Sequence, residues 1–171
     1  MAFGFDFDMT RCIGCRACQV ACKDKNRLEV GTLYRNVKSY TVGTFPNVKS
    51  YSYSGSCNHC ENPICLANCP TGAISKAEDG TVVQDQNKCI GCRMCVMSCP
   101  YGHPQYFPEK GVSGKCDGCY GLRANGDQPA CVAGCPNRAL DAGDVDELRK
   151  KYGNDLDKGT IVVLPSPDLT Q

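Results

Sequence analysis

Sixteen cysteines, arranged in four groups of four, limit what this chain of 171 residues can fold into more than any other feature. The groups are Cys12, Cys15, Cys18 and Cys22; Cys57, Cys60, Cys65 and Cys69; Cys89, Cys92, Cys95 and Cys99; and Cys116, Cys119, Cys131 and Cys135. The first and third have the spacing CxxCxxCxxxC, in which three neighbouring thiolates hold one cubane cluster and the fourth reaches another cluster. The last three groups end in Cys-Pro, as the bacterial ferredoxin run does. The spacing therefore predicts four [4Fe-4S] clusters.

Two other uses of cysteine are weaker alternatives. A secreted disulfide-rich domain would explain the number of cysteines. However, the CxxC pairs are too close for relaxed disulfides throughout, and residues 1–10 lack the basic and apolar stretches of a signal peptide. Structural zinc uses two separated pairs, whereas here three thiols fall within seven residues. Both alternatives predict a colourless protein.

The composition indicates that clusters replace part of the hydrophobic core. The hydrophobic fraction of 42% counts the cysteines, and without them it falls to about a third, which is low for a core. Bound metal substitutes for buried apolar area in such chains, so we expect the cluster-free chain not to fold.

Ligation also changes the charge of the chain. Four clusters of about 2− each bring the formal net charge of +1 to about −7, a balance that argues against nucleic-acid binding. Basic residues near the ligands are predicted either to offset cluster charge and raise reduction potentials or to lie in solvent. They are Arg11, Arg16, Lys23, Lys25, Arg93, Lys115 and Arg138. No segment reaches the length of an apolar membrane span, so we expect a soluble or peripheral chain.

Internal repeats divide the chain into two predicted units. The pentapeptide at 12–16, Cys-Ile-Gly-Cys-Arg, recurs at 89–93, which indicates duplication. Asp79-Gly80, between strand-forming residues, predicts a hairpin that joins the second and third groups. The predicted domains are an inner unit at 51–106, a discontinuous outer unit at 1–50 and 107–143, and a C-terminal helix and tail at 144–171. The fold class is α+β, with two nested bacterial-ferredoxin-like 2[4Fe-4S] units of short strands, short helices and long loops.

In the nested arrangement, the last cysteine of each group ligates the sister cluster. The expected sets are Cys12, Cys15, Cys18 and Cys135 (cluster 1); Cys22, Cys116, Cys119 and Cys131 (cluster 2); Cys57, Cys60, Cys65 and Cys99 (cluster 3); and Cys69, Cys89, Cys92 and Cys95 (cluster 4). Sequential pairing, first group with second and third with fourth, is the alternative. Every cluster already has four thiolates, so His59 and His103 are expected to pack or to contact a partner. No nucleophile with its base and no acid–base carboxylate pair is found, so no catalytic residue is predicted.

Other elements can be predicted at the two ends of the chain. Apolar residues at positions 3, 5 and 7 predict a strand, and a short helix is expected to carry Cys18 and Cys22. Asp144 and Glu147 form a helix N-cap signature, which predicts a helix from Asp144 to Tyr152 that closes before Gly153. Residues 161–164 are expected to form an edge strand, followed by a loose tail from Pro165.

The four-group pattern resembles the iron-sulfur subunit of dimethyl sulfoxide reductase-type molybdenum enzymes over nearly the whole chain. The matching segments are 56–61, 99–102 with 104–106, 115–120, 135–141 and 146–151. The resemblance implies an electron-transfer subunit of anaerobic respiration, not catalytic alone. It would relay electrons through four [4Fe-4S] clusters between a quinol-linked membrane subunit, or a soluble donor, and a molybdopterin (bis-MGD) catalytic subunit. Related nitrate enzymes carry tryptophan where this chain has Cys92, so a four-iron cluster is implied here.

The resemblance also orients the chain and leaves alternatives. It implies that the outer unit faces the catalytic subunit and the inner unit faces the membrane subunit. The equivalent subunit of a formate, thiosulfate or polysulfide enzyme is one alternative, and a stand-alone polyferredoxin, a stable monomer, is another. Without a signal peptide of its own, the chain is expected to acquire clusters in the cytoplasm. Export with a partner that carries a twin-arginine signal would then place it on the outer face of the cytoplasmic membrane; a cytoplasmic location is the alternative.

Overall fold

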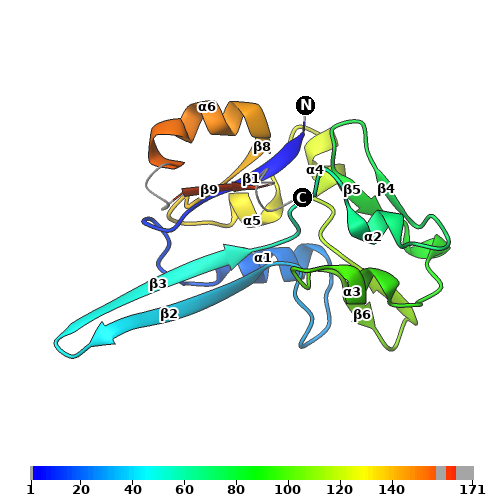
Figure 1. The fold of residues 1–171 in the computed structure, drawn as a ribbon, viewed down its shortest axis with the longest axis horizontal. Helices are drawn as coiled ribbons and strands as arrows, with labels where there is room; N and C mark the ends of the chain where they lie inside the picture. The colour runs from blue at the N-terminus through cyan, green and yellow to red at the C-terminus, as the bar shows by residue number, and fades with distance from the viewer. Residues whose placement is uncertain (1, 157–160, 165–171) are drawn as a thin grey trace.

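The structure, a computed structural model, describes residues 2–156 and 161–164, with side chains up to residue 153. Its elements are β1 (Phe3–Asp8), α1 (Ala17–Lys25), β2 (Asn36–Thr44), β3 (Asn47–Gly55), α2 (Ile64–Ala67), β4 (Ile74–Lys76), β5 (Val82–Gln84), the 3-10 helix η1 (Gln86–Lys88), α3 (Met94–Ser98), β6 (Gln105–Phe107), β7 (Val112–Gly114), α4 (Tyr120–Ala124), α5 (Ala130–Ala133), β8 (Leu140–Asp144), α6 (Val145–Leu156) and β9 (Ile161–Leu164). Short helices and strands alternate with long loops (Figure 1), which confirms the α+β class.

An antiparallel sheet of order β8-β1-β9 lies between helix α6 and the cysteine-rich part of the molecule (Figure 1). Its central strand β1 confirms the strand predicted from the alternating phenylalanines. All six residues of β1 are buried, because the sheet is covered on both faces. Phe3, Phe5 and Phe7 pack with cysteines of the main core, while α6 contacts all three strands. The sheet thus provides one wall for the cysteine groups of the outer unit.

The C-terminal elements agree with the prediction except at one helix end. Strand β9 pairs with β1 and forms an edge of the sheet, as expected for 161–164. The Asp144 side chain accepts hydrogen bonds from the backbone N–H groups of Asp146 and Glu147, which confirms the predicted cap. The prediction that the helix closes before Gly153 is wrong, because α6 runs to Leu156. A glycine inside a helix is disfavoured by only about 1 kcal/mol, and packing on the sheet outweighs this. The tail predicted from Pro165 lies outside the described residues.

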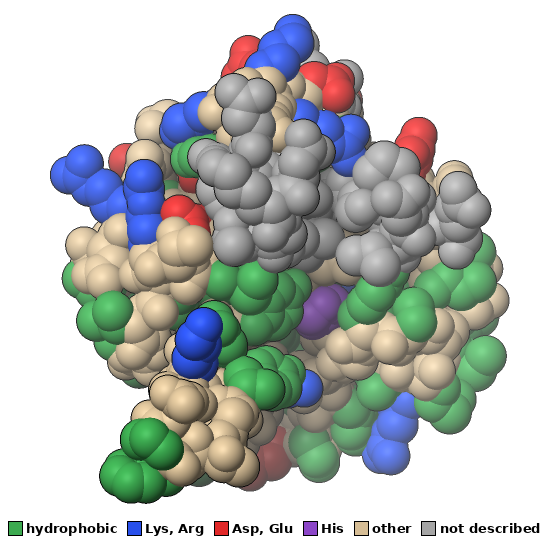
Figure 2. Space-filling view, turned by 60° about the vertical axis from the view of Figure 1, so that its left-hand side comes forward, with side chains coloured by type: hydrophobic (Ala, Val, Ile, Leu, Met, Phe, Trp, Pro, Cys, Tyr) green, Lys and Arg blue, Asp and Glu red, His purple; other side chains and the backbone are tan. Residues whose placement is uncertain are grey.

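Hairpins form much of the remaining structure. Strands β4 and β5 pair as predicted around Asp79-Gly80, and β6 pairs with β7. A longer hairpin of β2 and β3 projects from the body (Figure 1) and carries exposed apolar side chains towards its tip (Figure 2). The predicted domain limits at 50/51 and 106/107 fall inside β3 and β6 respectively. The division into two units stays a prediction.

The repeated pentapeptide adopts the same backbone twice, as expected for a duplication. Gly14 and Gly91 both have a φ of 69°, and Arg16 and Arg93 have φ values of 63° and 62°. Each repeat leads into a helix, α1 or α3. A Cβ at Gly14 would collide with Ser52, and one at Gly91 with the backbone of Gly111. Both glycines are therefore required by the left-handed backbone and by close packing.

Asp6 in the central strand makes the sheet sensitive to pH. Its side chain is 2% exposed, and burial, followed by the nearby Asp141 and Asp8, raises the pKa of Asp6 from 3.8 to about 7. The folded state therefore binds the proton more tightly than the unfolded state, and stability falls as pH rises from about 4 to 7. We expect Asp6→Asn to stabilise the holoprotein at pH 8 by more than about 1 kcal/mol, and by less at pH 6, where the folded state keeps Asp6 mostly protonated. Thermal unfolding at the two pH values tests this, with exposed Asp127→Asn as the control. Equal effects at both pH values would contradict the prediction.

Candidate iron-sulfur sites

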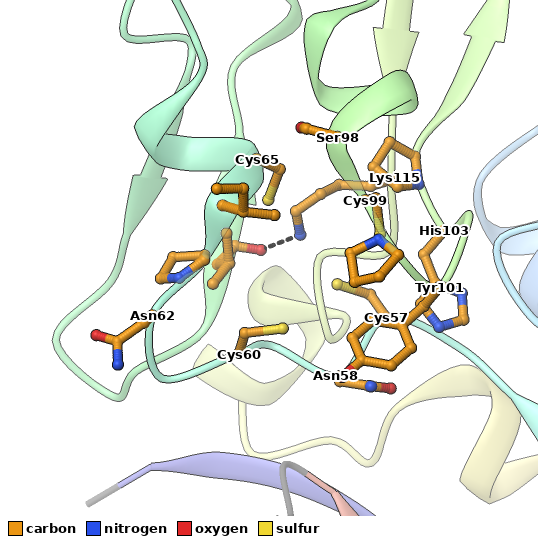
Figure 3. A pocket seen from close by; sticks show the side chains of 15 residues that line it. Cys57, Asn58, Cys60, Asn62, Cys65, Ser98, Cys99, Tyr101, His103 and Lys115 are labelled. Atoms are coloured by element: carbon orange, nitrogen blue, oxygen red, sulfur yellow. Dashed lines mark hydrogen bonds between the residues drawn. The ribbon is translucent and has the colours of Figure 1, made fainter. Parts of the chain in front are cut away.

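The four cysteines expected for cluster 3 line one cavity of about 370 Å³. Cys57 and Cys60 follow β3, Cys65 lies on α2, and all three belong to the second group. Cys99 follows α3 and belongs to the third group. Figure 3 shows Cys57, Cys60 and Cys65 around a common space into which the Lys115 side chain also points. This is the crossed combination of cysteines, and the sequential alternative would not bring Cys99 to this cavity.

A second cavity is lined by the four cysteines expected for cluster 1. Cys12, Cys15 and Cys18 belong to the loop and helix start after β1, and Cys135 lies just after α5. Helices α1 and α5 pack together, and Gly134 permits the close approach, since a Cβ there would lie 2.9 Å from Ala21 Cβ. The packing of these two helices thus brings the first and fourth groups together.

The cysteines expected for cluster 2 form the most deeply buried set. All four are buried, and they interact electrostatically with one another. Cys22 interacts with Cys119 and Cys131. Cys116 interacts with Cys22 and Cys131. Of the set expected for cluster 4, Cys89 and Cys92 interact with Cys95, and Cys69 packs in the same hydrophobic cluster as Cys95. The structure therefore brings together the cysteines expected for clusters 1, 2 and 3 and places Cys69 near those of cluster 4, while the ligand sets themselves stay a prediction.

The donor chemistry of these places fits cubane clusters. Among residues 2–153, no three His, Cys, Asp or Glu side chains converge closely enough for a single metal ion, and the thiols expected for clusters 1 and 3 line cavities instead. Burial raises the pKa of Cys22 to about 12 and that of Cys65 to about 11. These thiols are neutral until a metal replaces the proton, because the thiolate is the form that ligates.

Hydrogen bonds reach several ligand sulfurs. The backbone N–H groups of Ala139, Gly118 and Ser113 donate to the sulfurs of Cys135, Cys116 and Cys89 at 3.3–3.4 Å. Although burial opposes it, hydrogen bonding by Ser113 lowers the pKa of Cys89. Such bonds stabilise negative charge on sulfur and raise the reduction potential of a cluster.

Ser113 on β7 offers a direct test of this effect. Its hydroxyl lies 3.2 Å from the Cys95 sulfur and 3.5 Å from the Cys89 sulfur, and Gln84 donates to it, which leaves its proton for sulfur. We expect Ser113→Ala to lower the potential of cluster 4 by up to about 60 mV. Potentiometric EPR titration measures the shift, and Ser39→Ala, whose hydroxyl bonds Ser52, is the control. An unchanged potential for cluster 4 would contradict the assignment of Ser113 to this cluster.

The two histidines take packing positions. His59 is 2% exposed, and its Nδ1 accepts the backbone N–H of Val82 at 3.1 Å. Burial, with nearby Lys115 and Arg123, lowers the pKa of His59, which keeps the imidazole neutral. His103 lines the cluster 3 cavity, and burial lowers its pKa to about 4.

The basic residues separate into exposed and buried positions. Arg11, Arg16, Arg93 and Arg138 are exposed, and Lys25 pairs with Asp117 at 3.3 Å. Lys115 is buried and does not lie in solvent. Arg35 is also buried, beside Cys18 and Cys22, and it was not predicted from the sequence. It stands 13 residues from the nearest cysteine in sequence, so no local spacing signal marked it.

Exposed ligand loops lie over cluster 1 and cluster 4. Cys15 and Cys92 are exposed, and the isoleucines before them, Ile13 and Ile90, are 68% and 67% exposed. No helix within the described part of the chain is long and apolar enough to cross a lipid bilayer.

Comparison with known proteins identifies the family of this chain. The family described as "4Fe-4S dicluster domain" matches residues 48–145, and "4Fe-4S binding domain" matches residues 9–31. The sequence is 48% identical to the B subunit of anaerobic dimethyl sulfoxide reductase of Escherichia coli K12 and 46% identical to that of Haemophilus influenzae, each over 99% of this chain and 85% of the relative. It is 43% identical to thiosulfate reductase electron transfer subunit PhsB of Salmonella typhi, over 82% of this chain and 74% of the relative. The protein therefore belongs to the family of iron-sulfur B subunits of dimethyl sulfoxide reductase-type enzymes, whose members are electron-transfer subunits.

Proposed function

We propose that the chain is a four-cluster electron relay between a molybdopterin (bis-MGD) catalytic subunit and an electron donor, in the order cluster 1, 2, 3, 4. The observation that carries the order is the proximity of neighbouring ligand sets. Cys18 of set 1 interacts electrostatically with Cys131 of set 2, and Cys116 of set 2 interacts with Cys57 of set 3. Cys65 of set 3 and Cys95 of set 4 share one hydrophobic cluster.

Each [4Fe-4S] cluster, when bound, supplies one-electron redox chemistry. The residues of the chain then perform three tasks. Thiolates of the crossed sets hold neighbouring clusters at fixed separations, because two cysteines of one short helix, such as Cys18 and Cys22 of α1, ligate two different clusters. The phenylalanines of β1 and the core around Cys22 and Cys116 exclude water from the central sites. The exposed loops at Cys15 and Cys92 give partners access to the two ends.

The names of the relatives support the kind of partner. Two relatives are B subunits of anaerobic dimethyl sulfoxide reductases, and a third is the electron transfer subunit of thiosulfate reductase. We infer that a catalytic subunit covers the cluster 1 end and that a quinol-oxidising membrane subunit or a soluble donor serves the cluster 4 end. Export with a twin-arginine partner to the outer face of the cytoplasmic membrane belongs to the same proposal.

Anaerobic purification of the tagged chain from its native cells tests this function. We expect a molybdenum-containing large subunit to co-purify, and the bound clusters to oxidise when the substrate of that subunit is added. A stable brown monomer without a partner would contradict the proposal and favour a stand-alone polyferredoxin. Cell fractionation of the same strain tests the location.

A further inference from the structure

Arg35, in the loop before β2, is a fully enclosed cation without a carboxylate partner among the described residues. Its side chain is 2% exposed. One terminal nitrogen donates to the backbone oxygen and hydroxyl of Ser54 at 3.1 and 3.2 Å, and the other donates to the Ser56 hydroxyl at 2.8 Å. The guanidinium carbon lies 4.7 Å from the centre of the Phe5 ring. All these groups are neutral, and a guanidinium stays protonated in proteins. Its charge therefore needs compensation from elsewhere.

The nearest source of negative charge is the cysteine ligands. Arg35 interacts electrostatically with Cys131, Cys116 and Cys22 of cluster 2 and with Cys18 of cluster 1. A hydrogen-bonded path also leads to cluster 1, because the Ser54 hydroxyl that Arg35 contacts lies 3.4 Å from the Cys18 sulfur. Arg35 thus stands at the junction of clusters 1 and 2.

Lys115 is a second buried cation, and it lies near the ligands of clusters 2 and 3. It is 5% exposed, and its amine donates to the backbone oxygens of Val82 and Cys116. No carboxylate in the described part of the chain pairs with it. It lines the cluster 3 cavity and interacts electrostatically with Cys65 of cluster 3 and Cys116 of cluster 2. Two buried cations therefore lie close enough to interact with the ligands expected for cluster 2.

Burial of all four cluster 2 ligands disfavours reduction of that cluster, and the two cations oppose this effect. Reduction adds a negative charge, and a low-dielectric site disfavours added charge. A nearby buried cation stabilises the reduced form more than the oxidised form, and solvent screens it little. An exposed cation at the same distance has a much weaker effect.

We propose that Arg35 and Lys115 are redox-tuning residues, two buried cations that hold cluster 2 at a higher reduction potential than its burial alone would give. Arg35 acts on cluster 1 as well, and Lys115 acts on cluster 3. This inference rests on the proposed relay, in which cluster 2 is an internal step that must stay reducible for electrons to pass.

Potentiometric EPR titration of the loaded protein tests the role of Arg35. In Arg35→Met, we expect the ratio of reduced to oxidised cluster 2 at a fixed potential to fall tenfold or more, which is a downward shift of at least about 59 mV for a one-electron centre. Cluster 1 shifts in the same direction, and cluster 4 keeps its potential. Arg35→Lys retains the charge and is expected to stay close to wild type. The matched control is Arg138→Met, which removes an exposed arginine near Cys135 and is expected to change no ratio more than about threefold.

Several outcomes would overturn the inference. The first is an Arg35→Met variant in which the potentials of clusters 1 and 2 are unchanged. The second is an equal shift of all four clusters. The third is a shift in Arg35→Lys as large as that in Arg35→Met. Lys115→Met tests the same idea independently and must lower the reduction potentials of clusters 2 and 3. Lys115→Arg is its charge-preserving control. Iron content identifies the loaded fraction in every variant. The titration requires no partner subunit, so its failure is distinguishable from failure of the proposed function, which co-purification decides.

Discussion

Removal of iron is expected to abolish the folded structure of this chain. Eight of the 22 buried hydrophobic residues in the described part are cysteines, and each loses its metal-mediated connection when the cluster leaves. The strands β4, β5, β6 and β7 have three residues each, and isolated hairpins of this size are marginal in water. Arg35 and Lys115 would also become buried charges without compensation, at a penalty of several kcal/mol.

Circular dichroism and urea titration of anaerobically prepared apoprotein measure this effect. We expect loss of nearly all cooperative unfolding, with the holoprotein treated in the same buffers as the control. A sigmoidal urea transition in the iron-free chain would show that the polypeptide core is sufficient, and it would contradict the role given to the clusters.

Cys22→Ser is expected to damage cluster 2 and spare the cluster of its own group. Cys22 lies on α1 about one turn after Cys18, yet it interacts with Cys131 and Cys119 of the fourth group. Serine is a poor replacement for a buried thiolate, so we expect loss of one iron or of the whole of cluster 2, with iron falling from about 16 to between about 15 and 12 atoms per chain. EPR of the reduced protein, together with iron analysis, identifies the cluster that is lost.

Cys135→Ser is the matched reciprocal variant. Cys135 belongs to the fourth group but lines the cavity with Cys12, Cys15 and Cys18, so its loss is expected to damage cluster 1 and spare cluster 2. If Cys22→Ser removed the cluster 1 signal and Cys135→Ser removed that of cluster 2, each group would ligate its own cluster and the nesting would be wrong.

The ligand groups, the hairpin at Asp79-Gly80 and the strand at 3–8 could be predicted because each has a local signal. Cysteine spacing is fixed by the cluster, and turn residues and alternation act over a few positions. The duplicated pentapeptide was equally informative, since both copies adopt the same left-handed backbone at glycine and arginine.

The projecting β2–β3 hairpin was not predicted, although its sequence carries a signal. Asn-Val-Lys-Ser-Tyr at 36–40 recurs at 47–51, and the two copies lie on strands paired in antiparallel register. Polar residues at most positions hide the alternation that marks a half-buried strand. Arg35, at the base of this hairpin, was missed for a different reason. Its burial follows from tertiary packing against Phe5, Ser54 and Ser56, which no spacing within the sequence reveals.

The end of helix α6 shows how packing overrides a local rule. Gly153 is a common helix terminator, but Val145 and Leu148 are buried and form one hydrophobic cluster with Tyr152. Lys151 and Tyr152 also contact the Asp141 carboxylate at 2.6 and 3.0 Å. These contacts hold the last turns on the sheet, and the helix continues past the glycine.

An anaerobic reductive titration of the purified chain, with iron determined on the same sample, tests the four-cluster relay most directly. Four complete [4Fe-4S] clusters predict about 16 iron atoms and an uptake of about four electrons per chain, in one-electron steps. A colourless chain that contains zinc, or a fully iron-loaded chain that accepts only two electrons, would contradict the relay.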